Sequence, residues 1–160
     1  MVIVDAARLD RREKVLAFAQ SGTQWLLGTR LALHIVTPGS SSVRLPWESV
    51  QAADWVQDDE TLTVSEVGEF GRTGASYVFV LEDPALLLQL IRERVSASVV
   101  LQRGYLVDGK KGFKVIGRRS PVGGPIAWMH EYDAGIDPDL PGVREAAAEA
   151  LVRARADVGE

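Results

Sequence analysis

The first eighty residues carry short apolar or alternating stretches separated by turn residues, and this pattern predicts β-strands. In Thr61–Val67 (TLTVSEV) apolar and polar side chains alternate, as they do in a strand with one buried face. Short strands at such close spacing favour a small barrel or a sandwich over a parallel sheet. The predicted strands are residues 15–20, 24–30, 31–37, 43–47, 50–56, 61–67 and 77–81.

The periodicity changes after residue 82. Asp83 followed by Pro84 predicts a helix start, because a capping side chain precedes a proline at the first helical position. Leu87, Ile91 and Val95 fall on one helical face. The apolar residues beside that face are Leu86, Leu90 and Ala97. Such a broad apolar sector predicts a helix buried against more than one surface. Its end stays open, because residues 98–101 (SVVL) also suit the start of a strand.

The last third returns to strands and ends in a helix. Residues 105–107 and 113–119 flank Asp108-Gly109, a dipeptide that favours the tight turn of a hairpin. Residues 126–132 predict a third strand, and residues 141–157 predict a helix with a narrow, alanine-rich apolar face. That face comprises Val143, Ala147, Ala150, Leu151 and Ala154. The predicted fold class is α+β. An antiparallel β-barrel capped by a helix (1–102) is followed by a β-meander and C-terminal helix (103–160) that pack on it and share its core.

The first part resembles the bacterial PH-like and GRAM-like domains. Residues 28–33 (GTRLAL) are similar to a segment of these domains in which a threonine and a basic residue precede an apolar strand. Residues 44–50 (RLPWESV) are similar to the segment that leads into their next strand. Residues 86–95 lie where their capping helix falls. The resemblance covers about residues 10–100 and implies a PH-like barrel. The whole chain is also similar to proteins of high-GC bacteria with the same combination. No function follows, because one fold hosts many functions.

Composition restricts the function classes. The 160 residues include no cysteine, which excludes disulfides and thiolate chemistry and is typical of a reducing cytoplasm. The N-terminal apolar stretch is too short for a signal peptide, and residues 84–91 (PALLLQLI) are too few to span a membrane. The net charge of −4 argues against general binding to nucleic acid or anionic lipid. We expect a cytoplasmic protein without a cofactor.

Catalytic signatures are weak. His34 and His130 are on different predicted strands, and no nucleophile-elbow motif accompanies them, so the chain is not expected to be an enzyme. No metal site is expected either, although His130 beside Glu131 keeps that question open. A further alternative is a small-ligand or enzymatic pocket between the two parts, lined by Trp128 and His130.

Two loops bear on phosphate binding. The glycine-rich residues 68–74 (GEFGRTG) join two predicted strands and contain Glu69, whereas a phosphate loop leads into a helix and ends in Lys-Ser/Thr. We therefore expect a flexible hairpin loop, in which Phe70 is a candidate contact residue. Residues 21–24 (SGTQ) form the first hairpin loop and carry no cation, so phosphoinositide binding is not expected.

The largest local excess of positive charge is in residues 103–119, which contain six cations and a single anion, Asp108. Lys114 and Arg118 share a strand face, so this basic hairpin is suited to an acidic protein surface or to phosphates. The alternative is a solvated strand edge, neutralised by the acidic residues 131–139. The candidate partner-binding residues are Arg103, Lys110, Lys111, Phe113, Lys114, Arg118 and Arg119.

We therefore expect a non-catalytic protein-interaction or scaffold domain, with nucleic-acid or ribonucleoprotein binding through the basic hairpin as the alternative. We expect different environments for the two tryptophans of residues 44–55. Trp47 shares a face with Val43 and Leu45 and is expected in the core. Trp55 follows a kink near Glu48 and is expected to be covered by the C-terminal part.

Overall fold

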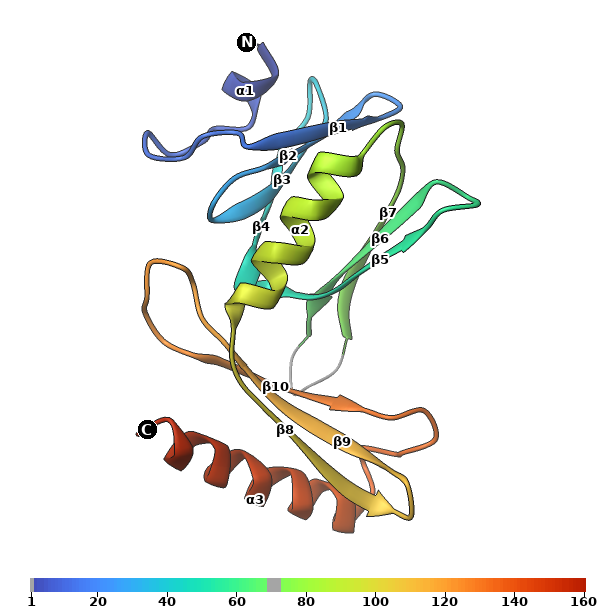
Figure 1. The fold of residues 1–160 in the computed structure, drawn as a ribbon, viewed down its shortest axis with the longest axis vertical. Coiled ribbons are helices and arrows are strands. Elements are labelled where there is room, and N and C mark those ends of the chain that lie inside the picture. Colours follow the sequence, from blue (N-terminus) through green and yellow to red (C-terminus); the bar gives the residue numbers. More distant parts are fainter. Residues whose placement is uncertain (1, 69–72) are drawn as a thin grey trace.

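The computed structural model describes residues 2–68 and 73–160. Within them the chain is mixed α and β, with three antiparallel sheets and three α-helices, as the sequence predicts at this coarser level. The molecule is elongated, with the N-terminus at one end of its long axis and the last helix at the other (Figure 1). No helix of the described part combines the length and apolar character needed to cross a membrane. The candidate contact loop at Glu69 and Phe70 lies outside the described residues.

Sheet A contains the first four strands as a simple meander in the order β1-β2-β3-β4. Residues on its inner face, such as Ala17 and Ala19, are buried, whereas Phe18 between them is exposed, which is the alternation expected of a strand. The strands are β1 (Ala17–Ser21), β2 (Gln24–Gly28), β3 (Ala32–Val36) and β4 (Val43–Pro46).

Sheet B contains the next three strands in the order β5-β6-β7. They are β5 (Val50–Val56), β6 (Thr61–Val67) and β7 (Thr73–Val80). A single 3₁₀ turn, η1 (Trp47–Ser49), separates sheet B from sheet A. Pro46 has no N–H to donate at this point, and the turn then ends the ladder. The two sheets have no strand pairing between them in the described chain, so the predicted closed barrel is not formed there.

Sheets A and B pack against each other around one hydrophobic cluster. Trp47 lies at its centre and is completely buried, which confirms the expectation for this tryptophan. Its indole Nε1 donates a hydrogen bond to the carbonyl oxygen of Thr29 at 3.0 Å, so the one polar atom of the ring is satisfied. The buried members are Ala17, Ala19, Leu26, Leu33, Ile35, Leu45, Trp47, Val50, Leu62, Val64, Phe79, Leu81, Leu87, Leu90 and Ile91.

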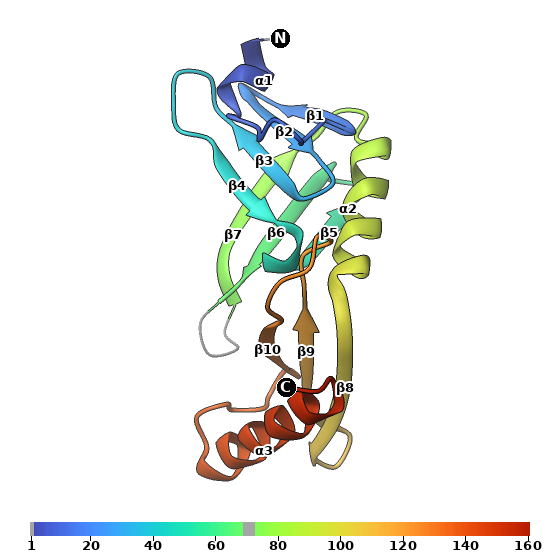
Figure 2. The same cartoon turned by 90° about the vertical axis from the view of Figure 1, so that its left-hand side faces the viewer.

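Helix α2 (Ala85–Ser98) covers this cluster from one side (Figure 2). It approaches β2 closely, because a Cβ built on Gly28 would lie 2.5 Å from Cδ2 of Leu90. The helix starts one residue later than predicted: Pro84 is its N-cap, and no side chain caps it. Leu86 is 73% exposed, so the apolar sector is buried on one side and not on two.

Strand β8 (Val99–Asp108) follows α2 without a loop, which resolves where the helix ends (Figure 2). It pairs with β9 (Lys111–Arg118), which pairs with β10 (Ala127–Tyr132), and these three strands form sheet C. The predicted hairpin is confirmed, with Gly109 at a left-handed φ of 57° in its turn.

Helix α3 (Pro141–Asp157) lies on one face of sheet C (Figure 1). Its buried side is the predicted alanine-rich face, except that Leu151 is only partly buried. Phe113 and Val115 of β9 pack against that face. This cluster has no member in common with the core of sheets A and B, so the expected shared core is not formed.

The N-terminal segment covers the outer face of sheet A. It consists of α1 (Val2–Ala6) and the chain that leads to β1. Ala7 of this segment is buried against Leu27 and Val36 of the sheet. Five residues are too few to show a repeated helical period, so the sequence pattern did not predict α1.

Candidate functional site

The basic hairpin places its seven candidate residues at different depths. Phe113 and Arg118 are buried and are not accessible to a partner. Arg103 is exposed, with its Nε 3.9 Å from Oδ2 of Asp157 on α3. The remaining cations are all exposed: Lys110, Lys111, Lys114 and Arg119.

Arg118 is a structural link. Only 5% of it is exposed, and its Nη1 donates to the carbonyl oxygen of Val95 at 3.0 Å and to Oγ of Ser98 at 2.9 Å. Its Nη2 donates to the carbonyl oxygen of Gln51 in β5 at 3.3 Å. Burial lowers the pKa of the guanidinium, and the negative charge of Glu131 opposes this shift. The residue therefore joins α2, sheet B and sheet C.

Phe113 belongs to an aromatic cluster beneath α3. Its ring stacks on Tyr105 at a centroid distance of 5.4 Å and meets the edge of His130 at 5.9 Å. Tyr132 lies 5.8 Å away in a tilted arrangement. These rings stabilise the packing of α3, and Phe113 offers no stacking surface to a nucleic-acid base.

The exposed cations do not converge on one point. Lys111 begins β9 and Arg119 lies just beyond its end, a separation of roughly 26 Å at about 3.3 Å per strand residue. Lys114 is paired across the ladder with Glu131 of β10, whose side chain points to the same face of the sheet. Lys110 and Lys111, at the turn, form the densest positive charge of the hairpin.

The two histidines lie in separate environments. Nε2 of His130 donates a hydrogen bond to the carbonyl oxygen of Ala147 at 3.0 Å, because a carbonyl oxygen can only accept. Trp128, on the same face of sheet C, donates from Nε1 to Oε2 of Glu160 at 3.0 Å. Neither residue lines the two surface hollows described below. Within residues 2–68 and 73–160 no three His, Asp or Glu side chains gather in a way that could hold a metal ion.

His34 belongs to a buried polar cluster that sequence reasoning missed. Glu13, in the N-terminal segment, accepts a hydrogen bond from Oγ1 of Thr29 at 2.8 Å. Its Oε1 also lies 3.4 Å from Nε2 of His34 and 3.6 Å from Nη2 of Arg44. Glu13 is far from these residues in sequence, and its partners come together only when the segment folds over sheet A.

The charges of this cluster shift two pKa values. Burial raises the pKa of Glu13, but the hydrogen bonds from Thr29 and His34 and the positive charge of Arg44 outweigh it, so the net shift is downward. Burial lowers the pKa of His34 more than its contact with Glu13 raises it. A neutral His34 then donates from Nε2 to an ionised Glu13. Nδ1 of His34 has no hydrogen-bond partner in the described structure.

A different surface emerges on sheet B, where the sequence analysis proposed no site. Three sets of residues paired across β5, β6 and β7 have side chains that point away from the core, and Asp54 is the one charged residue among them. Val78 is 63% exposed and Val80 58% exposed, although valine is commonly buried. We name this surface the valine–threonine face; it comprises Ala52, Asp54, Val56, Thr61, Thr63, Ser65, Ser76, Val78 and Val80.

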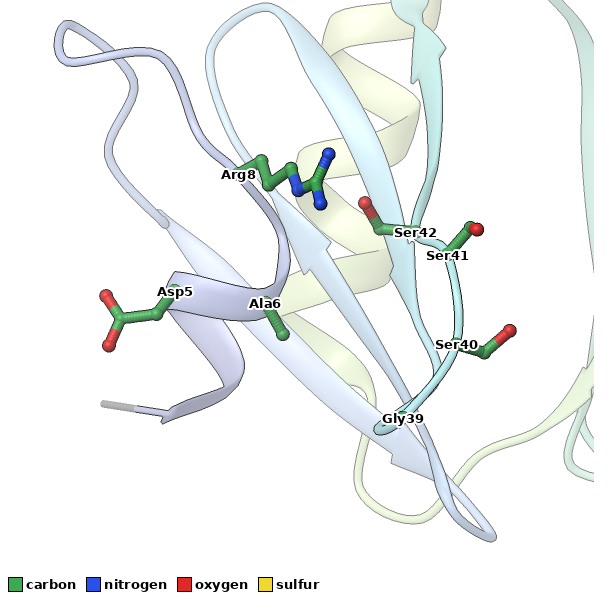
Figure 3. Close-up of a pocket in the computed structure, with 7 residues that line it drawn as sticks. All are labelled: Asp5, Ala6, Arg8, Gly39, Ser40, Ser41 and Ser42. Carbon is green, nitrogen blue, oxygen red and sulfur yellow. The ribbon is translucent and has the colours of Figure 1, made fainter.

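Two hollows are present elsewhere on the surface. One, of about 470 Å³, lies between β5 and α2 and is lined by Trp55 together with residues of the helix, including Leu88. Trp55 is half-buried there, and its Nε1 donates to Oε1 of Gln57 at 3.0 Å. The tryptophan is thus flanked by α2 and not by the C-terminal part, contrary to expectation. The other hollow, of about 850 Å³, lies beside α1 (Figure 3).

Comparisons with models of protein families, with curated proteins and with solved structures find no match to this chain.

Proposed function

We propose that this protein is a non-catalytic, cytoplasmic protein-interaction domain that docks a partner protein on the valine–threonine face. The absence of cysteine from the sequence is in keeping with a reducing compartment. The order of a four-stranded sheet, a three-stranded sheet and a helix supports a PH-like classification of the first part. That classification does not identify a partner, because domains of one fold bind different partners.

The exposure of β-branched side chains on sheet B is the observation that carries the proposal. Val56, Val78 and Val80 are exposed on a face where only Asp54 is charged. Contiguous apolar patches on a protein surface commonly mark interaction sites. Depletion of charge at the centre of a patch is also a property of protein interfaces. The pleated sheet provides a rigid face, so a partner would order few flexible side chains on binding.

A second candidate function is nucleic-acid binding at the tip of the basic hairpin. Lys110 and Lys111 are adjacent and exposed at the turn, and Lys114 follows on β9. Two observations favour the protein partner instead. Arg118 and Phe113 are buried, and Lys114 lies beside Glu131, so fewer cations are free to meet a nucleic acid and Phe113 cannot stack on a base.

One capture experiment separates the two functions. Extract from the cell that produces the protein is passed over immobilised wild type, V78K/V80K and K110Q/K111Q/K114Q, at low and moderate salt. We expect that wild type and K110Q/K111Q/K114Q retain the same partner protein at both salt concentrations. V78K/V80K should not retain it. Unfolding curves of both variants, within about 1 kcal/mol of wild type, show that the fold is intact.

Retention of the same proteins by V78K/V80K would contradict the proposal. Capture of RNA or DNA that declines steeply with salt and requires the three lysines would instead support the second candidate.

A further inference from the structure

The larger hollow lies between the end of α1 and the loop that joins β3 to β4, outside sheet A (Figure 3). Its volume of about 850 Å³ is within the range of small-molecule sites. It is lined by Asp5, Ala6, Arg8, Gly39, Ser40, Ser41 and Ser42.

Arg8 is a positive charge without a counter-charge. Its guanidinium extends into the hollow toward Ser42, while the carboxylate of Asp5 points away from it (Figure 3). Within residues 2–68 and 73–160 the Arg8 side chain makes no hydrogen bond or ion pair, in contrast to Arg44, Arg103 and Arg118. Arg8 also has a left-handed φ of 50°, a conformation that costs a non-glycine residue about 1 kcal/mol or more.

The opposite wall is the serine-rich loop, in which the hydroxyl of Ser42 points toward Arg8 while those of Ser40 and Ser41 point away from it (Figure 3). Ser40 and Ser41 are exposed, Ser42 is half-buried, and in the part of the chain that the structure covers no hydrogen bond engages their hydroxyls. The loop is anchored by a hydrogen bond from the backbone N–H of Ser40 to the carbonyl oxygen of Thr37 at 3.0 Å. The loop therefore places one unpaired hydroxyl, that of Ser42, across from the unpaired guanidinium of Arg8.

This combination suits an anion with several oxygens. A guanidinium offers two parallel N–H groups to a phosphate, and a hydroxyl can donate to a further oxygen. We propose that Arg8 and the hydroxyl of Ser42 bind the phosphate group of a phosphate monoester. The rest of the hollow is large enough for the polar body of such a ligand.

The site is independent of the protein-docking proposal. It lies on the outer side of sheet A, whereas the valine–threonine face belongs to sheet B. Variants of one site leave the residues of the other unchanged, so each proposal can fail alone.

The test uses the whole chain and glycerol 3-phosphate as the probe. Amide resonances of Gly39, Ser40, Ser41 and Ser42 are followed by ¹H–¹⁵N NMR during titration of wild type, R8A and R11A. Arg11 is an exposed arginine of the same segment that does not line the hollow, so R11A matches R8A in charge. We expect saturable shifts at these amides in wild type and R11A, and an affinity lower by about tenfold or more in R8A.

A second arm distinguishes a soluble ligand from a lipid headgroup. Phosphatidylcholine vesicles with and without phosphatidic acid are sedimented with the three proteins. Binding that needs phosphatidic acid and is lost in R8A alone identifies a lipid source. Its absence, together with the NMR shifts, identifies a soluble ester. The proposal is overturned if the loop amides show no saturable shift, or if R8A binds glycerol 3-phosphate as R11A does.

Discussion

Arg118 on β9 donates a hydrogen bond to the carbonyl oxygen of Val95 in α2, at 3.0 Å. This carbonyl lies in the last turn of the helix, where backbone oxygens lack intrahelical partners. A positive charge is also favourable at the negative end of a helix dipole. The same guanidinium reaches Ser98 and Gln51. The sequence places Arg118 in a charged surface hairpin. In the structure Arg118 instead links sheets B and C.

Replacing Arg118 with alanine is expected to destabilise the protein by roughly 2–4 kcal/mol. The change removes the hydrogen bonds that a buried charged group donates to Val95, Ser98 and Gln51, and the Val95 carbonyl then keeps the hydroxyl of Ser98 as its donor. Urea unfolding of R118A measures the loss.

K114A is the matched control, because Lys114 is exposed on the same strand and is expected to change stability by about 0.5 kcal/mol or less. Equal stability of R118A and K114A would show that Arg118 does not link the two parts.

Glu13 is expected to hold the N-terminal segment on sheet A. E13Q removes the negative charge that Thr29, His34 and Arg44 surround, and should cost about 1–3 kcal/mol. Hydrogen exchange should become faster in residues 2–16 and stay unchanged in β9. K14Q alters a neighbouring exposed residue and serves as the control. Unchanged exchange of the segment in E13Q would contradict the anchoring role.

The same cluster makes stability depend on pH. The pKa of His34 is lowered by burial, so the unfolded chain takes up a proton near pH 6.5 while the folded chain does so only at lower pH. The free energy of unfolding should therefore decrease as the pH falls below about 6.5. The pKa of Glu13 is also lowered, so a further decrease should begin below about pH 4.3.

Urea unfolding between about pH 3 and 8 measures this dependence, with H34Q as the comparison. H34Q should flatten the slope between pH 5 and 7 and retain the decrease at lower pH. An identical slope in H34Q and wild type would show that His34 does not titrate as proposed.

Strand and helix positions follow closely from the sequence because the signals are local. The alternation in Thr61–Val67 and the alanine-rich face of Pro141–Asp157 give elements with the predicted bounds. Trp47 is also found in the core, as expected from its position on the same strand face as Val43 and Leu45. Helix α1 is missed because five residues are fewer than two helical turns and cannot show a repeated pattern.

Features that depend on distant parts of the chain could not be read from the sequence. The 3₁₀ turn at Trp47–Ser49 separates two sheets that the strand pattern alone would join into a barrel. Arg118 reads as a surface cation until β9 is placed against α2. Val78 and Val80 lie in a predicted strand (YVFVL) that is apolar on both faces, so the sequence does not show which face a partner element covers.

Site-specific photo-crosslinking shows whether a partner protein contacts the valine–threonine face. A p-benzoylphenylalanine at Val78 lies on the valine–threonine face, and one at Lys110 lies at the tip of the basic hairpin. On irradiation in the producing cell, the variant at position 78 should give a discrete protein adduct and the variant at position 110 none. An adduct at position 110 with none at position 78 would contradict the proposed docking face.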